Sequence, residues 1–316
     1  MLDYQSVPPN IHVSLSRVGV RDMEKIIRLR HDGEESLFYS RLNLFVDLSP
    51  GQMGVHMSRF DQCVTEIIEE LVREEGMDIE SLVEKMARLV LIRQQAVRSE
   101  ISISAKYPAE RITPVSGQKT QQIYTLIGMA VSTRKRTKKL IGVEVTGLTV
   151  CPCAQTMVRE KAERTLEQAG FSRDEIGRIF RMIPLPSHNQ RGKATLMIGS
   201  EERIDARRLV AIVEEAFSSE VYDLLKRPDE LFVVEKAHRR PRFVEDSVRE
   251  MLWRVIEDFS YLADDSFVLA KQENFEGTHH YSVFAERSGT LAEIKEELWG
   301  NQYLLRHTTV QEWLNG

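Results

Sequence analysis

The hydrophobic positions of this chain recur with two different periods, which alternate along the sequence. In the first half, apolar and polar residues alternate with a period of two along several segments, which is typical of half-buried strands. The predicted strands of this half are residues 13–20, 36–48, 99–107 and 121–133. Between the second and the third of them, apolar residues recur every three or four positions, which predicts two amphipathic helices. The first helix begins near Ser58 and ends near Gly76, and the second begins at Asp78, a good N-cap.

The second half repeats this order of elements loosely, without detectable sequence identity between the halves. Its predicted strands are residues 139–149, 193–198, 266–274 and 281–287. Its predicted helices are residues 157–169, 205–219 and 243–259, and a last helix begins at about residue 291. The chain therefore divides into two predicted modules, residues 1–137 and residues 138–316, each of which combines strands with helices.

Helix pairs inserted between antiparallel strands are typical of an α+β architecture. An open antiparallel sheet leaves edge strands whose backbone groups need partners or cover. Association with further copies of the chain is one way to cover them, so we expect a homo-oligomer.

The composition excludes several classes of protein. The chain has 316 residues, of which 42% are hydrophobic and 29% charged, so it is neither disordered nor fibrous. Its formal net charge of −5 argues against a dedicated nucleic-acid-binding protein. Its apolar runs are only a few residues long, whereas a membrane span needs about 20. No apolar signal region is visible near the N-terminus, and an odd number of cysteines, three, argues against a disulfide framework, so we expect a cytoplasmic location.

The one block of like charge is the basic run at residues 134–139. It lies between two predicted strands and lacks the interleaved aromatic residues of surfaces on which bases stack. We interpret it as a solvated hairpin tip, and the alternative is a patch that steers a charged substrate.

Three residues have side chains that suit a catalytic metal ion. Cys151 belongs to the motif Cys151-Pro152-Cys153, for which we expect extended backbone and at most one thiol directed into a given site. His188 lies in a polar loop, and Glu230 lies in an acidic region. A thiolate, an imidazole and a carboxylate, with one water, make a four-coordinate site for Zn²⁺ or Fe²⁺. The bland alternatives are a pair of buried core cysteines, an ordinary loop histidine and a solvated carboxylate.

Three further features suggest work on a nucleotide or on protons. His279 and His280 are adjacent, which suits acid–base or metal chemistry, although a surface pair at the end of a strand is the alternative. His56 and Arg59 flank the start of the first predicted helix, where an anion such as phosphate binds or a plain helix cap forms. Glu245 lies in a second acidic segment and is solvated in the simplest interpretation.

Seven motifs in order resemble the type IB GTP cyclohydrolases and their archaeal counterparts in methanopterin biosynthesis. The motifs are Gly54-Val55-His56-Met57-Ser58-Arg59-Phe60, Cys151-Pro152-Cys153, Ser187-His188-Asn189-Gln190-Arg191, Arg227-Pro228-Asp229-Glu230, Glu235-Lys236-Ala237, Phe243-Val244-Glu245-Asp246 and Glu273-Asn274-Phe275-Glu276. The resemblance implies a tunnelling fold with two tandem modules in each subunit. It also implies a homotetramer, or at least a dimer, with active sites at subunit interfaces.

The reaction that the resemblance implies opens the imidazole ring of GTP. Hydroxide adds to C8, formate leaves, and the ribose rearranges to build the pterin. By the family motifs, Cys151, His188 and Glu230 are the metal ligands, and the metal lowers the pKa of the attacking water. Fe²⁺ is the expected metal, and Zn²⁺ and Mn²⁺ are alternatives. The resemblance places His56 and Arg59 near the substrate, from a neighbouring subunit or from the same one.

The resemblance also assigns the residues that contact the purine. Glu245 anchors the guanine by accepting N–H bonds from N1 and the 2-amino group. His279 protonates a purine nitrogen, with His280 as the other candidate. The family pattern has a second histidine two residues after the first, and Tyr281 occupies that position here.

The product depends on the branch of the family. The N-terminal segment at residues 13–20, the chain length and Ala285-Glu286-Arg287 resemble the archaeal branch, which forms 7,8-dihydroneopterin 2′,3′-cyclic phosphate. The alternative product is 7,8-dihydroneopterin triphosphate. Two other classes stay open: a tunnelling-fold pterin or purine enzyme with Cys151 as a nucleophile, and a binding module without turnover.

Overall fold

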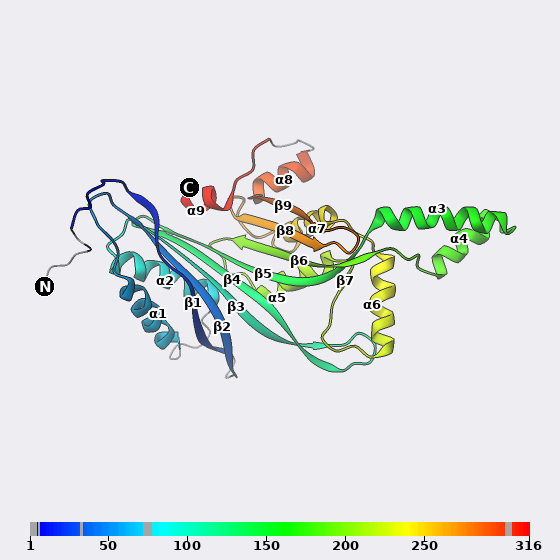
Figure 1. Ribbon diagram of the computed structural model, residues 1–316, viewed down its shortest axis with the longest axis horizontal. Coiled ribbons are helices and arrows are strands. Elements are labelled where there is room, and N and C mark those ends of the chain that lie inside the picture. The colour runs from blue at the N-terminus through cyan, green and yellow to red at the C-terminus, as the bar shows by residue number, and fades with distance from the viewer. Residues whose placement is uncertain (1–4, 6, 32–33, 72–77, 301–304) are drawn as a thin grey trace.

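One antiparallel sheet runs through the whole chain (Figure 1). The computed structural model describes residues 5, 7–31, 34–71, 78–300 and 305–316. Within them, nine strands form the sheet in the order β1-β2-β3-β4-β5-β6-β8-β9, and β7 pairs with β5 beside this path. The strands are β1 (Leu15–His31), β2 (Glu34–Leu48), β3 (Arg98–Ile112), β4 (Lys119–Thr133), β5 (Thr137–Val150), β6 (Asn189–Gly199), β7 (Ser219–Glu220), β8 (Phe267–Phe275) and β9 (Ser282–Thr290).

The helices divide into those that cover the sheet and those that project from it. They are α1 (Met57–Leu71), α2 (Ile79–Arg93), α3 (Pro152–Gln168), α4 (Arg173–Met182), α5 (Ala206–Ala216), α6 (Arg227–Arg239), α7 (Val244–Asp258), α8 (Leu291–Gly300) and α9 (Val310–Asn315). Helix α2 packs on β3, β4 and β5, α5 packs on β5 and β6, and α7 packs on β8 and β9. Figure 1 shows α3 and α4 extending away from the sheet, and no residue of α3 is buried.

The hydrophobic core crosses the boundary between the two halves. Buried apolar side chains of the described residues form one large cluster between the sheet and α1, α2, α5 and α7, which includes Phe60, Leu82, Val213 and Ile256. Figure 1 shows these helices following the sheet from one end to the other. Because the cluster is continuous, the halves bury their apolar surface together rather than as separate cores.

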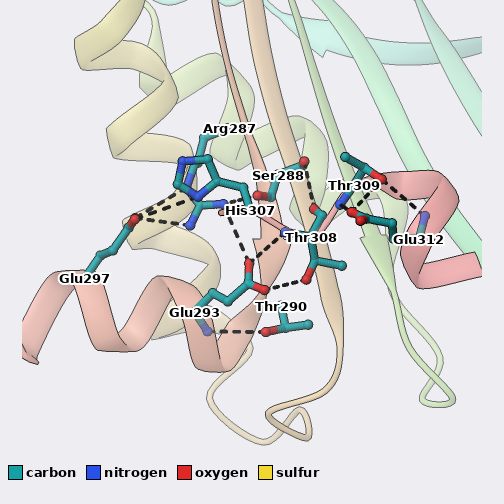
Figure 2. Close-up of polar contacts among 9 residues, drawn as sticks. All are labelled: Arg287, Ser288, Thr290, Glu293, Glu297, His307, Thr308, Thr309 and Glu312. Carbon is teal, nitrogen blue, oxygen red and sulfur yellow. Dashed lines mark hydrogen bonds and ion pairs between the residues drawn. The ribbon is translucent and has the colours of Figure 1, made fainter. Parts of the chain in front are cut away.

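A smaller apolar cluster lies on the opposite face of the sheet and is covered by the C-terminal segment. Leu314 of α9 packs there against residues of β4, β5, β6 and β8. Figure 2 shows the polar contacts that hold the segment before α9 against β9 and α8. Ser288 Oγ donates to the carbonyl of Thr308 (3.0 Å), whose N–H donates to Glu293 (3.2 Å). Thr309 caps α9 through a capping box with Glu312.

The two halves join at a tight hairpin between β4 and β5. Ser132 pairs with Thr137, and Thr133 donates its N–H to the carbonyl of Arg136, so the basic run forms the predicted hairpin tip. The predicted module boundary at residues 137 and 138 falls at the start of β5. Pairing of β4 with β5 stops at Thr125 and Glu144, and β7 pairs with β5 beyond that point.

A buried ionic contact links the halves where β4 has left β5. Tyr124 of β4 donates to Glu214 of α5 (2.7 Å), and Arg111 of β3 forms an ion pair with the same carboxylate (2.9 Å). Burial and the bond to Glu214 raise the pKa of Tyr124, and burial raises the pKa of Glu214 against the opposing effects of Tyr124 and Arg111. The carboxylate therefore bridges two strands of the first half to a helix of the second.

The predicted α+β architecture is confirmed, and most predicted elements have counterparts. Strand β1 is longer than predicted because a register shift between Val20 and Met23, with Asp22 at φ 54°, interrupts the alternation. Helix α3 begins at Pro152 rather than at residue 157, and α4, α6 and the short α9 were not predicted. The predicted end of the first helix at Gly76 lies outside the described residues.

Two of the helices that were not predicted, α4 and α6, lack a continuous apolar face. Helix α4 buries only Ile176 and depends on a capping box between Ser172 and Glu175. Helix α6 buries Asp229, Val233 and Ala237. A carboxylate therefore occupies a buried position at which the pattern of an amphipathic helix requires an apolar residue. No described helix combines the length and apolar character needed to cross a membrane.

Glu80 is a buried carboxyl group in the first turn of α2. It is 2% exposed, and its carboxylate accepts the N–H of Ile204 at 3.3 Å. Burial, and then the charge of Asp78, raise the pKa of Glu80 to about 7, although the Ile204 N–H, Lys139 and Arg203 act in the opposite direction. The protonated form is therefore the one that the folded protein favours.

We predict that Glu80→Gln removes a pH dependence of stability. Between about pH 4.5 and pH 7 the unfolded chain ionises Glu80 while the folded chain keeps its proton, so wild-type stability falls as pH rises, by about 3 kcal/mol from this group. Glutamine keeps an acceptor for Ile204 and does not titrate. Urea unfolding of both proteins at pH 5 and pH 7 measures the difference. Glu84→Gln, a half-buried site on the same helix, is the control, and parallel curves for wild type and Glu80→Gln contradict the prediction.

Candidate functional site

Cys151 and His188 are brought together at the end of one strand pair. Strands β5 and β6 pair from Leu140 and Gly199 to Val150 and Asn189. One residue further on, the N–H of Cys151 donates to the carbonyl of His188 at 3.1 Å. Ser187 Oγ then donates to the carbonyl of Cys151 at 2.7 Å. Two predicted ligands from separate segments of the chain therefore share one backbone frame.

The Cys-Pro-Cys motif is a helix start, so the expectation of extended backbone is wrong beyond Cys151. Cys151 is the N-cap of α3 with φ −72° and ψ 117°, and Pro152 begins the helix. Proline suits this position because its missing N–H is not needed in the first turn. Cys151 is half-buried and Cys153 is exposed. The alternative of two buried core cysteines is thereby excluded.

The imidazole of His188 has an unsatisfied nitrogen that faces a buried carboxylate. Its Nδ1 is buried and has no hydrogen-bond partner among the described residues. Glu276 Oε2 lies 3.9 Å from this nitrogen, and the side chain of Glu276 is 7% exposed. Glu276 has no predicted role, although it ends the motif Glu273-Asn274-Phe275-Glu276. A carboxylate beside an imidazole fixes the tautomer and the orientation of a metal-binding histidine.

Buried polar side chains continue from this pair along one face of the sheet. By the strand register, this face carries Thr149, Gln190, Gln272 and Asn274. The amide oxygens of Gln190 and Gln272 are buried without a hydrogen-bond partner among the described residues. The ring of Phe217 lies against Gly147, where an added Cβ would be 2.2 Å from it. Sequence patterns missed these residues because single polar positions in strands are ordinary.

Glu230 is not grouped with Cys151 and His188 in this chain. It lies in the first turn of α6, exposed, and its carboxylate makes no hydrogen bond or ion pair with the described residues. The preceding residue, Asp229, is buried. No set of three His, Cys, Asp or Glu side chains in the described ranges is arranged to hold a metal ion.

The predicted purine-binding residues lie on exposed segments. Glu245 is in the first turn of α7 and is exposed. His279 and His280 follow β8, and both are exposed. The ring of His279 stacks on Tyr281 with centroids 4.9 Å apart and an interplanar angle of 7°. The tyrosine at the second histidine position of the family pattern therefore holds the first histidine by ring stacking.

His56 and Arg59 lie at the predicted helix start but away from the other candidates. Arg59 donates to the carbonyl of Arg93 at 3.0 Å, and Gln94 donates to the carbonyl of His56 at 2.9 Å. Figure 1 shows α1, which carries Arg59, at the end of the molecule opposite α3. One chain therefore does not bring these residues to Cys151.

The donors at the strand end fit a divalent metal ion in part. A thiol, an imidazole with an orphaned buried nitrogen and a buried carboxylate are the donor types that Zn²⁺ and Fe²⁺ accept. Cys151 and His188 are adjacent, whereas Glu230 is on a different element. The chain thus brings the backbones of two of its three predicted ligands together, and the ligand assignment stays a prediction.

Comparison with known proteins identifies close relatives along nearly the whole chain. A family model for type I GTP cyclohydrolase folE2 matches residues 1–285. The chain is 39% identical over 305 residues to GTP cyclohydrolase MptA of Methanococcus aeolicus, which covers 94% of this chain and 99% of that protein. It is 35% identical over 304 residues to GTP cyclohydrolase MptA of Methanocaldococcus jannaschii, with 94% and 97% covered.

Solved structures with a similar fold are uricases. The uricase of Arthrobacter globiformis matches with a TM-score of 0.51 and 9% identity over 87% of this chain and 93% of that one. A uricase from Bacillus fastidious matches with a TM-score of 0.50 and 10% identity over 94% and 99%. These are neighbours of the tunnelling-fold type, and at such low identity the likeness concerns the fold alone.

We predict that iodoacetamide distinguishes the three thiols. Cys153 is exposed in the first turn of α3, whereas Cys63 is 2% exposed and burial raises the pKa of its thiol, which lowers the fraction of reactive thiolate. Cys153 therefore reacts first and Cys63 last in the native, metal-free protein. Mass spectrometry of peptides over time gives the order, and urea-unfolded protein, in which the order disappears, is the control. Modification of Cys63 as fast as Cys153 contradicts the assigned geometry.

Proposed function

Because the chain belongs to the type I GTP cyclohydrolase folE2 family and is therefore an enzyme that acts on GTP, we propose that it catalyses metal-dependent opening of the guanine imidazole ring. Formate leaves, closure of the cyclic phosphate on the α-phosphorus expels diphosphate, and the product is 7,8-dihydroneopterin 2′,3′-cyclic phosphate for methanopterin synthesis. The observation that carries the proposal is the 39% identity, along almost the full length of both chains, to a protein named GTP cyclohydrolase MptA. The triphosphate is the alternative product within the same family.

The proposed metal ligands are Cys151, His188 and Glu230. The backbone bond between Cys151 and His188 supports this assignment for the first two. Fe²⁺ is the proposed metal, with Zn²⁺ and Mn²⁺ as alternatives. A divalent ion bound there supplies hydroxide near neutral pH by lowering the pKa of water. Glu276 then orients the imidazole of His188, which the 3.9 Å approach supports.

The proposed substrate contacts come from exposed side chains. Glu245 accepts the N1 and 2-amino N–H groups of guanine, and His279 or His280 donates a proton to a purine nitrogen. The stack of His279 on Tyr281 favours His279 for this role, because it restricts the ring to one orientation. His56 and Arg59 contact the substrate from a neighbouring copy of the chain.

The proposed assembly is a homotetramer, or a dimer, of subunits with two tandem tunnelling-fold modules, residues 1–137 and 138–316. The order strand-strand-helix-helix-strand-strand occurs as β1-β2-α1-α2-β3-β4. It recurs as β5-β6-α5-α7-β8-β9 when α3 and α4, between β5 and β6, and β7 and α6, between α5 and α7, are treated as insertions, which supports the modules. The sheet ends in β1 and β9, and a second copy can cover these edges. A cytoplasmic location stays a prediction from the cysteine count.

We predict that Cys151→Ala and His188→Ala abolish formate release from GTP, whereas Cys153→Ala retains it. The first two remove metal ligands, and Cys153 is a matched exposed thiol two residues away. Formate and the mass of the pterin product are measured after anaerobic incubation of metal-stripped protein with GTP and Fe²⁺. Full activity of Cys151→Ala overturns the ligand set. If the Cys153→Ala protein keeps its activity after chelation but loses it on thiol alkylation, Cys151 is a nucleophile instead.

We predict that Glu245→Ala lowers kcat/KM for GTP by at least about tenfold, because loss of a hydrogen bond to a charged group costs about 1.5–3 kcal/mol. Glu257→Ala, an exposed carboxylate near the other end of α7, is the control and leaves kcat/KM unchanged. Steady-state kinetics of formate release measure both. Equal values for the two variants contradict the guanine-anchor role.

A further inference from the structure

We propose that Asp229 is a positioning residue for the candidate metal site, acting through helix α6. The helix is a strut that joins the turn between β3 and β4 to the backbone around Cys151 and His188. This inference rests on the proposed role of Cys151 and His188 as metal ligands. It assigns a function to a motif residue whose side chain points into the protein, beside the exposed Glu230.

The carboxylate of Asp229 locks the first turn of α6 to the first half of the chain. Oδ1 accepts the N–H groups of Val115 and Ser116, both at 2.8 Å. Oδ2 accepts the hydroxyl of Ser116 at 2.6 Å and the N–H of Lys226 at 2.9 Å. The residue is 0% exposed. Four donors thus converge on one buried carboxylate from two segments that lie more than 100 residues apart in the sequence.

The partner turn is itself held in shape. Thr113 accepts the N–H of Gln118 at 2.9 Å through its hydroxyl, which also lies 2.8 Å from the hydroxyl of Ser116. The turn therefore presents its two N–H groups and one hydroxyl to Asp229 as a fixed set. Removing the carboxylate leaves these donors without their acceptor in a buried place, which is costly.

Toward its C-terminal end, α6 is also held by an ionic contact. Lys236 forms an ion pair with Glu220 of β7, and Tyr222 donates to the same carboxylate at 2.8 Å. Glu220 pairs with Gly147 of β5, four residues before Cys151. Rotation of α6 about its axis would break this contact, so the helix has one orientation.

The last turn of α6 contacts the segments on both sides of the Cys151–His188 pair. Gln155 of α3 donates to the carbonyl of His238 at 2.7 Å. His238 Nε2 lies 3.4 Å from the carbonyl of Ser187, the residue before His188. Arg239 donates to the carbonyls of Arg181 and Met182 at 3.1 and 3.0 Å. The end of the strut therefore fixes the helix that begins at Cys151 and the loop that ends at His188.

The strut matters because β4 does not brace β5 on the side opposite β6 near Cys151. Pairing of β4 with β5 ends at Thr125 and Glu144, so β3 and β4 leave the sheet before β5 reaches Cys151. Figure 1 shows α6 standing between the far end of the β3–β4 hairpin and the base of α3. Metal sites require ligand positions accurate to about 0.5 Å. Loosening the first turn of α6 thus alters the positions of Cys151 and His188 beside its other end.

The test compares metal affinity among variants that remove the lock in steps. Asp229→Asn replaces one carboxylate oxygen with an amide NH₂ group, so at least one of the four donors to Asp229 loses its acceptor. Ser116→Ala removes only the hydroxyl donor. Ser116→Thr keeps the hydroxyl and is the conservative rescue. Glu110→Gln, which removes the exposed ion pair with Lys119 on the same hairpin, is the matched control. Chelator competition gives the Co²⁺ affinity of the full-length protein, and visible absorption of bound Co²⁺ reports thiolate ligation and geometry.

We expect Asp229→Asn to weaken Co²⁺ binding by at least about tenfold, the lower end of the effect of losing groups that orient metal ligands. Ser116→Ala weakens it less, and Ser116→Thr and Glu110→Gln leave it unchanged. The Co²⁺ spectrum of Asp229→Asn changes although circular dichroism shows a folded protein. If Asp229→Asn does not fold, the comparison of Ser116→Ala with Ser116→Thr decides.

Two results overturn the inference, and they are distinguishable. If Cys151→Ala removes Co²⁺ binding but Asp229→Asn and Ser116→Ala bind Co²⁺ with wild-type affinity and spectrum, the strut is purely structural and the proposed ligands stand. If Cys151→Ala binds Co²⁺ like wild type, the proposed ligand set fails and the positioning role of Asp229 fails with it.

Discussion

The hydrogen bond from the N–H of Cys151 to the carbonyl of His188 is the contact on which the candidate site depends. It extends the ladder of β5 and β6 by one step, so the register of two long strands decides which side chains meet at their end. A shift of that register by one residue would turn every side chain of the strand to the other face. The pattern of buried residues that sets the register of β5 and β6 therefore specifies the site as well as the core. A shift of the register would disrupt both.

The architecture around this contact explains why the chain needs both halves. The large apolar cluster is continuous across them, and Glu214 bridges Tyr124 and Arg111 of the first half to α5 of the second. Near Cys151, where β4 has left β5, helix α6 replaces the sheet as the link. Buried carboxylates such as Asp229 and Glu214 therefore link the two halves by accepting hydrogen bonds from fixed donors.

The sequence predicted the elements whose hydrophobic period is uninterrupted, and it failed where a local feature breaks that period. The long strands β4 and β5 and the helix α7 were found within a few residues of their bounds. The extension of β1 was missed because the bulge at Asp22 shifts the alternation, and α6 was missed because a buried carboxylate replaces an apolar residue. The adjacency of Cys151 and His188 was not derivable from spacing, since it depends on the pairing of β5 with β6. The position of Glu276 could not be predicted, because nothing in its sequence surroundings distinguishes a buried carboxylate from a solvated one. The roles assigned to Cys151, Glu230, Glu245 and the histidines stay predictions.

The central claim is that the protein opens the imidazole ring of GTP and expels C8. GTP labelled with carbon-13 at C8 tests it most directly when it is incubated without oxygen with the Fe²⁺-loaded protein and followed by NMR. The account predicts that the label leaves the purine and appears as free formate while a pterin forms. A label that stays in the guanine ring under these conditions, with Fe²⁺, Zn²⁺ and Mn²⁺ each tested, would contradict it.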